Sequence, residues 1–295
     1  MAKAGVCMNT TKNASRLMLI ASMCIFGTIG LIRRYIPLPS SLIALVRGII
    51  GALFLMAVVL VSKKKLDKSA IRHSFHLLTL SGIAIGFNWI LLFEAYNYTS
   101  VATATLCYYL APILVILASP LILKERLTVR KGMCAAIALT GMVLVSGVIE
   151  TGFSGFDEMK GILFGLGAAV LYASAILLNK KMPSVPAYDK TILQLSLASA
   201  ALLPYVLLTE TFNGLSVTPV SLLLLLIAGI VHTGIAYWLY FGSMAQLSSN
   251  TVALLSYIDP ILAIVLSMVF LHEPMSLYAG IGAVMILGAA FASET

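Results

Sequence analysis

Four ionisable residues inside long apolar stretches are the strongest candidates for chemistry in this sequence. They are Arg47, Glu94, His232 and Asp259. An ionised side chain costs about 2.5 to 3.5 kcal/mol at the centre of a membrane-spanning helix, so such residues are usually retained for a function. We therefore expect these four residues to mark a site in the protein interior.

Arg47 and Glu94 lie at similar depths in neighbouring stretches that would run in opposite directions. This placement predicts a bidentate salt bridge between them. Two interpretations follow. The bridge either holds two helices together, or the carboxylate of a bound molecule displaces Glu94 and binds to Arg47.

Asp259 and His232 lie nearer the middle of their stretches and are candidates for proton transfer, because histidine titrates near neutral pH. Asp259 precedes Pro260, whose missing N–H leaves a backbone carbonyl one turn earlier without its helical partner, so polar groups are expected to gather there. For His232 the alternative is a hydrogen bond to a neighbouring helix.

Aromatic and amide side chains in the same stretches form a second set of binding candidates. Aromatic walls with a few hydrogen-bonding groups suit a small organic molecule, including a cation. Each ring could equally pack helices together. No cysteine and histidine spacing predicts a metal site, and we expect no cofactor. The set comprises Asn88, Trp89, Tyr109, Tyr237, Trp238 and Tyr257.

The composition indicates a membrane protein. Hydrophobic residues make up 60% of the chain and charged residues only 10%, and the mean hydropathy is +1.03. A membrane-spanning helix needs roughly 20 apolar residues, and the runs are too long for barrel strands. We predict an all-α polytopic membrane protein with ten spans. These lie at 16–33, 41–62, 75–97, 100–123, 130–149, 160–180, 189–209, 219–242, 248–271 and 276–293.

The basic residues predict the orientation, because short cytoplasmic loops collect Lys and Arg. With the N-terminus inside, 15 of the 19 basic residues fall on the cytoplasmic side. Both termini are thus expected in the cytoplasm, with the protein in the plasma (inner) membrane. The net charge of +8 then reflects topology and anionic lipid, and nucleic acid is not expected as a partner. The basic start of the chain resembles a signal peptide, but it belongs to a repeat, so we expect it to be retained.

The second half of the chain repeats the first at a spacing of 148 residues. This shift places Tyr109 and Pro112 on Tyr257 and Pro260. It also places Glu125 on Glu273. Matched polar residues within and beyond an apolar stretch indicate a duplicated unit.

Five spans per unit would leave the second unit inverted relative to the first. We therefore expect a cytoplasmic tail at 1–15, repeats at 16–149 and 160–295, and an external linker at 150–159. Glu125 and Glu273 would lie at opposite membrane faces, either as locks that gate a site or as helix caps. Inverted repeats are typical of carriers that expose one site alternately to each side.

Several motifs resemble those of the EamA-type drug/metabolite transporters. The first half contains NWILLFEAY at 88–96, API at 111–113 and LKERL at 123–127. The second half contains SYIDPI at 256–261 and FLHEP at 270–274. The resemblance covers nearly the whole chain. It implies a ten-helix membrane carrier of small solutes, commonly an exporter of amino acids or related metabolites.

These observations together predict a secondary active transporter of small polar or zwitterionic, amino-acid-like metabolites. We expect export by alternating access, coupled to protons through Asp259 and His232, in a monomer or homodimer in contact with membrane lipid. The alternative is a flippase or carrier of a lipid-linked or organic-cation substrate. An intramembrane enzyme is disfavoured, because Asp259 lacks the second Asp of an aspartyl protease and the His272-Glu273 pair lacks the second His of a zinc hydrolase motif.

Overall fold

The computed structural model describes residues 2–63, 66–124, 127–145, 149, 156–182, 184–212, 217–244, 247 and 255–294. Across these residues all regular elements are helices and none is a strand. The helices are α1 (Ala2–Gly27), α2 (Ile29–Arg34), α3 (Ser40–Val61), α4 (Lys68–His73), α5 (Phe75–Tyr98), α6 (Val101–Tyr108), α7 (Ala111–Ile122), α8 (Val129–Val145), α10 (Phe156–Lys180), α11 (Ala187–Thr209), α12 (Pro219–Gly229), the π-helix η1 (Ile230–Ile235), α13 (Ala236–Met244), α15 (Ile258–Phe270) and α16 (Leu277–Glu294).

Among the described residues, seven helical segments are long and apolar enough to cross a membrane, which agrees with the predicted all-α polytopic protein. They are Asn13–Arg34, Ser40–Val61, Phe75–Tyr98, Val101–Ile122, Asp157–Lys180, Ala187–Thr209 and Pro219–Ser243.

The predicted count of ten spans is not reached by these helices. The stretch at 130–149 holds α8, whose 17 residues are at the lower limit for a crossing. The apolar parts of the last two helices, Ile258–Phe270 and Leu277–Ala292, are also short. Most of the residues just before α15 lie outside the described ranges.

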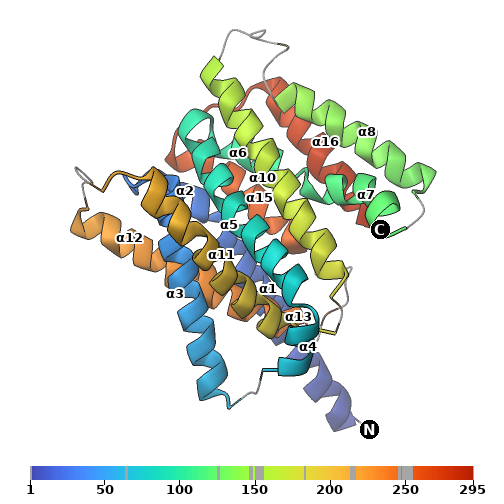
Figure 1. Cartoon of the computed structure of the whole chain (residues 1–295). Helices are drawn as coiled ribbons and strands as arrows, with labels where there is room; N and C mark the ends of the chain where they lie inside the picture. The colour runs from blue at the N-terminus through green and yellow to red at the C-terminus, as the bar shows by residue number, and fades with distance from the viewer. Residues whose placement is uncertain are drawn as a thin grey trace.

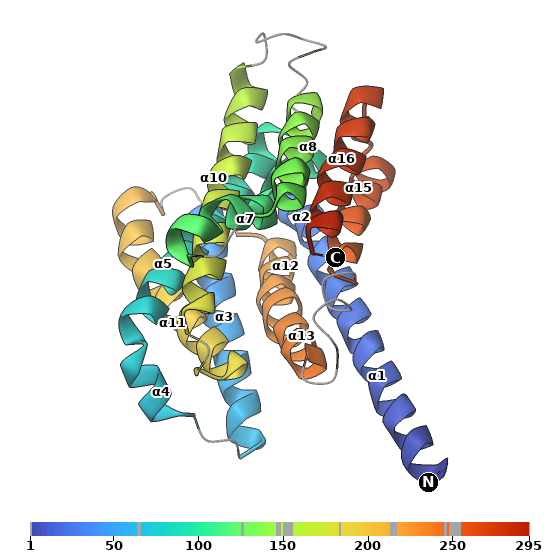
Figure 2. The same ribbon diagram turned by 90° about the vertical axis from the view of Figure 1, so that its right-hand side faces the viewer.

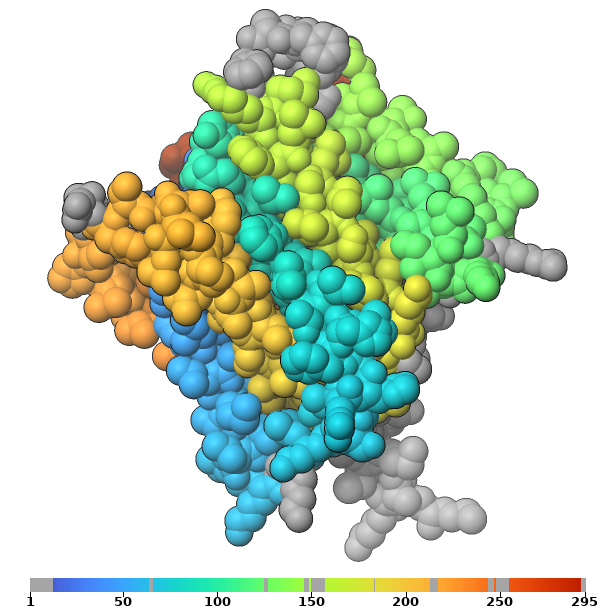
Figure 3. All heavy atoms as spheres, in the orientation of Figure 1, coloured from blue at the N-terminus to red at the C-terminus, as the bar shows by residue number. Residues whose placement is uncertain are grey.

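The helices pack into one bundle in which distant parts of the sequence lie side by side (Figures 1 and 2). The main contacts join α5 to α10, α8 to α16, α11 to both α3 and α5, and α1 to α13. Figure 3 shows α5, α10 and α11 together on the face toward the viewer. The pair α8 and α16 packs closely, since a Cβ added to Gly141 would lie 2.8 Å from the carbonyl oxygen of Gly282.

Three spans are interrupted, and each interruption lies in the bundle interior. The break between α6 and α7 falls at Tyr109 and Leu110, just before Pro112. A proline ring clashes with the carbonyl of the residue four positions earlier and supplies no N–H, so a regular helix cannot continue there. A break at Thr28 separates α1 from α2, and η1 interrupts the span formed by α12 and α13. The candidate residues lie beside these interruptions.

Candidate functional site

Arg47 lies on α3 in the interior and is only 5% exposed. Its Nε donates a hydrogen bond to Thr233 Oγ1 of η1 at 2.8 Å. Its guanidinium carbon lies 4.4 Å from the ring centre of Trp89 and 5.4 Å from that of Phe93, both on α5. Cation–π contacts of this kind stabilise a desolvated cation. Arg47 is thus held between three helical elements.

The predicted salt bridge between Arg47 and Glu94 is absent, and this prediction was wrong. Glu94 Oε2 instead accepts hydrogen bonds from Ser40 Oγ at 2.6 Å and from Asn97 Nδ2 at 3.1 Å. The reason is depth. Glu94 is four residues from the end of α5 and Arg47 is seven residues into α3, so at 1.5 Å per residue Arg47 lies roughly 4 Å deeper.

Glu94 belongs to a polar network near the end of its span. Arg33 Nη2 donates to Ser40 Oγ at 3.0 Å and to Asn97 Oδ1 at 3.1 Å, and both of these residues also donate to Glu94. Arg33 Nη1 donates to the carbonyl of Ile36 at 3.2 Å. The network therefore ties α2, α3 and α5 together, which is a structural role for Glu94.

Asp259 lies in the first turn of α15, where the helix dipole favours a negative charge. Tyr109 Oη donates a hydrogen bond to Asp259 Oδ2 at 2.5 Å. Tyr109 is placed for this contact by the break between α6 and α7. Two predicted site residues from different halves of the chain are therefore in direct contact.

Arg47 and Asp259 share a group of tyrosines. Tyr96, Tyr108 and Tyr237 lie within electrostatic range of both charged groups. Tyr172 stacks on Tyr108 with ring centres 5.1 Å apart. Tyr96, Tyr108 and Tyr172 were not among the predicted site residues. Two signals could have identified two of them, since Tyr96 ends the motif at 88–96 and Tyr108 adjoins Tyr109.

Neither charge has an ionic partner within the part of the chain that the structure describes. The two ion pairs found there join Arg34 to Glu273 and Lys160 to Asp157. The interior thus carries a cation and an anion that are not paired with each other and that lie within electrostatic range of the same tyrosines.

His232 lies on η1 and is 2% exposed. Its Nε2 is 2.8 Å from Thr28 Oγ1, at the break between α1 and α2, and its Nδ1 is 3.3 Å from the carbonyl oxygen of Ile227. The hydrogen bond to a neighbouring helix, one of the two predicted alternatives, is therefore present.

The remaining aromatic and amide candidates divide into inner and outer residues. Asn88 Nδ2 donates to the carbonyl of Ala168 at 2.6 Å, which links α5 to α10. Tyr237 stacks on Phe241 with ring centres 5.9 Å apart. Trp238 is 41% exposed, so its predicted place in an interior site was wrong. The side chain of Trp238 projects about 100° from that of Tyr237 and lies on the exposed side of α13.

Two further candidates make contacts with other elements of the bundle. The ring of Tyr257 packs edge-on against Phe291 of α16, with ring centres 5.9 Å apart. Glu273 forms an ion pair with Arg34 at 2.5 Å, accepts from the backbone N–H of Val101 at 2.9 Å and also accepts from Ser267 Oγ. Glu273 thus caps the start of α6. Its predicted counterpart Glu125 lies outside the described residues.

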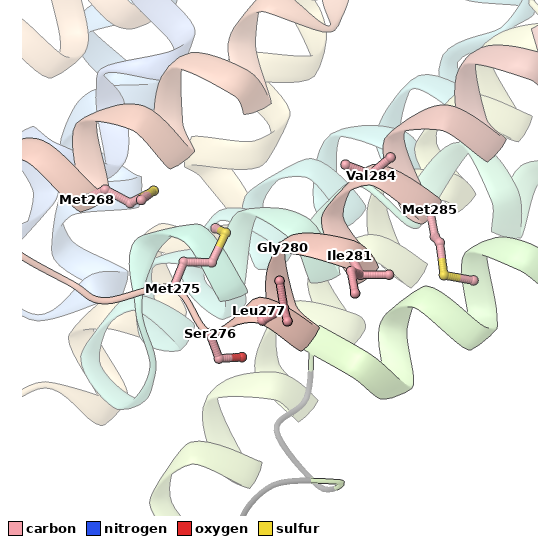
Figure 4. Close-up of a pocket in the computed structure, with 8 residues that line it drawn as sticks. All are labelled: Met268, Met275, Ser276, Leu277, Gly280, Ile281, Val284 and Met285. Carbon is pink, nitrogen blue, oxygen red and sulfur yellow. The ribbon is translucent and has the colours of Figure 1, made fainter.

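A separate hollow of about 500 Å³ lies between the end of α15 and the first half of α16 (Figure 4). It is lined by Met268, Met275, Ser276, Leu277, Gly280, Ile281, Val284 and Met285. None of these side chains is charged. Leu277 is 78% and Val284 is 73% exposed, as expected for a surface that faces lipid chains. This hollow contains none of the predicted site residues.

Comparison with known proteins identifies the family. The model of the EamA-like transporter family matches the chain twice, over residues 14–147 and 159–294. A solved crystal structure that is 22% identical in sequence has a TM-score of 0.66 and covers 95% of this chain and 96% of that chain. This likeness shows a common fold.

Curated relatives are similar to this chain over much of its length, and some of them are named as transporters. The uncharacterized transporter YxxF of Bacillus subtilis strain 168 is 34% identical over 93% of this chain and 88% of its own length. Protein PecM of Dickeya dadantii strain 3937 is 26% identical over 90% of this chain and 87% of PecM. Protein RarD of Escherichia coli strain K12 is 25% identical over 67% of this chain and 64% of RarD. With its long apolar helices, the chain is an integral membrane transporter rather than an enzyme, and it belongs to the EamA-like transporter family of the drug/metabolite transporter superfamily.

Proposed function

We propose that this protein is a secondary transporter of small zwitterionic, amino-acid-like metabolites. Arg47 would bind the carboxylate of the substrate and Asp259 its ammonium group. The observation that carries this proposal is the pair of opposite interior charges without ionic partners among the described residues. A buried charge is costly unless it is paired. A zwitterion supplies both missing partners at once.

The surrounding rings suit the same class of substrate. Tyr109 already donates to Asp259, and an ammonium group there would lie near tyrosine rings, which attract cations. The guanidinium of Arg47 uses its Nε for Thr233, so we infer that its terminal nitrogens remain available for a carboxylate. Arg47 disfavours an organic cation that lacks a carboxylate, because the second charge would stay unpaired.

Asp259 also offers a route to proton coupling. The carboxylate of Asp259 can hold a proton or the ammonium group of the substrate, but not both. The proton and the substrate therefore compete for one site. Competition for one alternately exposed site produces exchange, so protons entering the cell would drive export of the substrate. In this proposal His232 serves as a second proton carrier near the same interior region.

We further propose that the chain forms ten membrane spans arranged as two inverted repeats, at 16–149 and 160–295. The protein would lie in the plasma membrane with both termini in the cytoplasm. The helix contacts support the inverted repeats. The predicted counterpart of α1 is α10, and that of α5 is the span containing α13; α1 packs on α13 as α10 packs on α5. The α8 and α16 helices, also predicted counterparts, pack on each other. Such symmetry would let the halves exchange conformations.

The test is substrate exchange by the purified protein in liposomes, with labelled amino acids, organic acids and organic cations as probes. Arg47→Lys and Asp259→Asn are the diagnostic variants, and Lys181→Gln is the matched control because Lys181 is exposed. Asp259→Asn removes one partner of the proposed charge pair, which costs about 2 to 5 kcal/mol, so it should lower amino-acid exchange by about 30-fold or more. Arg47→Lys keeps the positive charge but loses the planar fork, so it should also lower exchange.

Other outcomes would refute parts of the proposal. Full exchange by Arg47→Lys would argue against a fork between the guanidinium and a carboxylate. Exchange of organic cations that depends on Asp259 but not on Arg47 would favour the organic-cation alternative. Retained pH-dependent uptake by Asp259→Asn would remove that residue as the coupling group. Activity with lipid-linked compounds alone would favour a flippase.

A further inference from the structure

An open hollow of about 700 Å³ lies over α4, far from the interior charges. It is lined by Lys68, Ser69, Arg72 and His73. All four side chains are exposed. Lys68 and Arg72 are four residues apart, as are Ser69 and His73, so all four share one side of this short helix. The lining offers hydrogen-bond donors and positive charge and contains no carboxylate.

The hollow lies where two membrane-spanning segments end. The α4 helix joins the end of α3 to the start of α5, at the lower edge of the molecule in Figures 1 and 2. The flanking residues Leu60, Val61 and Phe75 are apolar and 69%, 84% and 52% exposed, as expected where spans meet the lipid. The hollow therefore lies at the level of the lipid headgroups.

The α4 helix is held in place by contacts to the rest of the bundle. Asp67 Oδ1 accepts from the backbone N–H groups of Ser69 and Ala70 at 3.1 and 3.0 Å. The backbone N–H of Asp67 in turn donates to Asp189 Oδ2 at 2.8 Å, and Asp189 is buried on α11. Ala70 and Ile71 pack against a buried apolar cluster. The cationic side is thus presented on a fixed backbone.

The positive charge at this site is not neutralised within the described residues. Neither Lys68 nor Arg72 forms an ion pair there. The exposed carboxylate of Asp67 directly precedes Lys68 and offsets part of the charge, while its Oδ1 caps the start of α4. Lys63, at the end of the segment after α3, is exposed and adds positive charge. An anion is the ligand that this surface lacks.

We propose that the α4 hollow binds the phosphate of an anionic phospholipid headgroup. Lys68 and Arg72 would pair with the phosphate, Ser69 and His73 would donate hydrogen bonds, and the acyl chains would lie along the exposed apolar residues at the ends of α3 and α5. Juxtamembrane cations attract anionic lipids. This lipid site is separate from the proposed transport site, and lipid binding does not require transport activity.

The test is native mass spectrometry of the full chain released from neutral detergent, titrated with phosphatidylglycerol in a background of phosphatidylcholine. Each juxtamembrane cation contributes about five-fold to the affinity for anionic lipid, so the double variant Lys68→Gln, Arg72→Gln should bind phosphatidylglycerol about 25-fold more weakly than the wild type. The matched control is Lys180→Gln, Lys181→Gln, which removes the same charge from another exposed pair and should bind as the wild type does.

Further measurements separate the alternatives. The exchange variant Lys68→Arg, Arg72→Lys keeps both charges and should retain binding, which distinguishes loss of the site from misfolding. Equal weakening in the control double variant would overturn the proposal, since it would indicate general surface charge. Competition by inorganic phosphate as effective as that of the lipid would overturn the lipid assignment, and absence of retained phosphatidylglycerol on the wild type would refute the site.

Discussion

Replacing Glu273 with alanine should destabilise the protein more than removing its ion-pair partner Arg34. The side chain of Arg34 is 33% exposed, and exposed ion pairs contribute about 0.2 to 1 kcal/mol. The bonds from Val101 N–H and Ser267 Oγ reach an ionised acceptor, and such bonds contribute about 1.5 to 3 kcal/mol each. Arg34 Nη2 also donates to the carbonyl of Thr99 at 3.2 Å, so we expect a loss of about 1 to 2 kcal/mol for Arg34→Gln and about 3 kcal/mol or more for Glu273→Ala.

The assay is unfolding of the detergent-solubilised protein by a denaturing detergent, followed by circular dichroism. Glu273→Gln should fall between the two variants, because the amide keeps one acceptor oxygen but loses the charge. Added salt should reduce the difference between the wild type and Arg34→Gln, since screening weakens an exposed pair. If Arg34→Gln destabilised the protein as much as Glu273→Ala, the ion pair rather than the cap on α6 would dominate, and our reasoning would be refuted.

Three further predictions use the same unfolding assay. Thr233→Val removes the acceptor for Arg47 Nε and should cost about 1.5 to 3 kcal/mol; a neutral result would show that the aromatic rings alone hold the guanidinium. Tyr109→Phe removes the donor to Asp259 and should cost a similar amount, whereas Asp259→Asn keeps an acceptor and should cost less. Gly282→Leu places a side chain against the backbone of α8 and should cost more than about 3 kcal/mol through overpacking, so a wild-type midpoint would contradict the close packing of α8 and α16.

Much of the fold and part of the site could be predicted from the sequence. Apolar runs of about 20 residues identify spans because lipid offers the backbone no hydrogen bonds. The free-energy cost of placing a charge in the membrane interior identified Arg47 and Asp259 in the same way. The contact of Tyr109 with Asp259 joins two residues that were both identified, although their direct bond was not predicted.

The residues that contact each candidate site residue were harder to predict than the candidate residues themselves. Depth estimated from the ends of apolar runs carries an error of a few residues, and about 4 Å separates a salt bridge between Arg47 and Glu94 from two unrelated networks. Thr233 was not identified because a threonine in an apolar run has no unusual cost. The exposed side of a helix also depends on its rotation, which is why Trp238 was assigned to the interior.

The π-helix η1 holds one residue more per turn than a regular α-helix would at the same place. In a π turn the hydrogen bonds span five residues instead of four, and the side chains of His232 and Thr233 both contact carbonyl oxygens five positions earlier. Deleting one residue from η1 would let this turn become a regular α-turn, and the change in width would absorb the missing residue, so α13 would keep Tyr237 on its inner face. The same deletion in the regular α12 helix would turn everything after it by about 100°. The span can therefore lose one residue within 230–235 with loss of the local contacts of His232 and Thr233, whereas the same loss in α12 would exchange the inner and outer faces of α13.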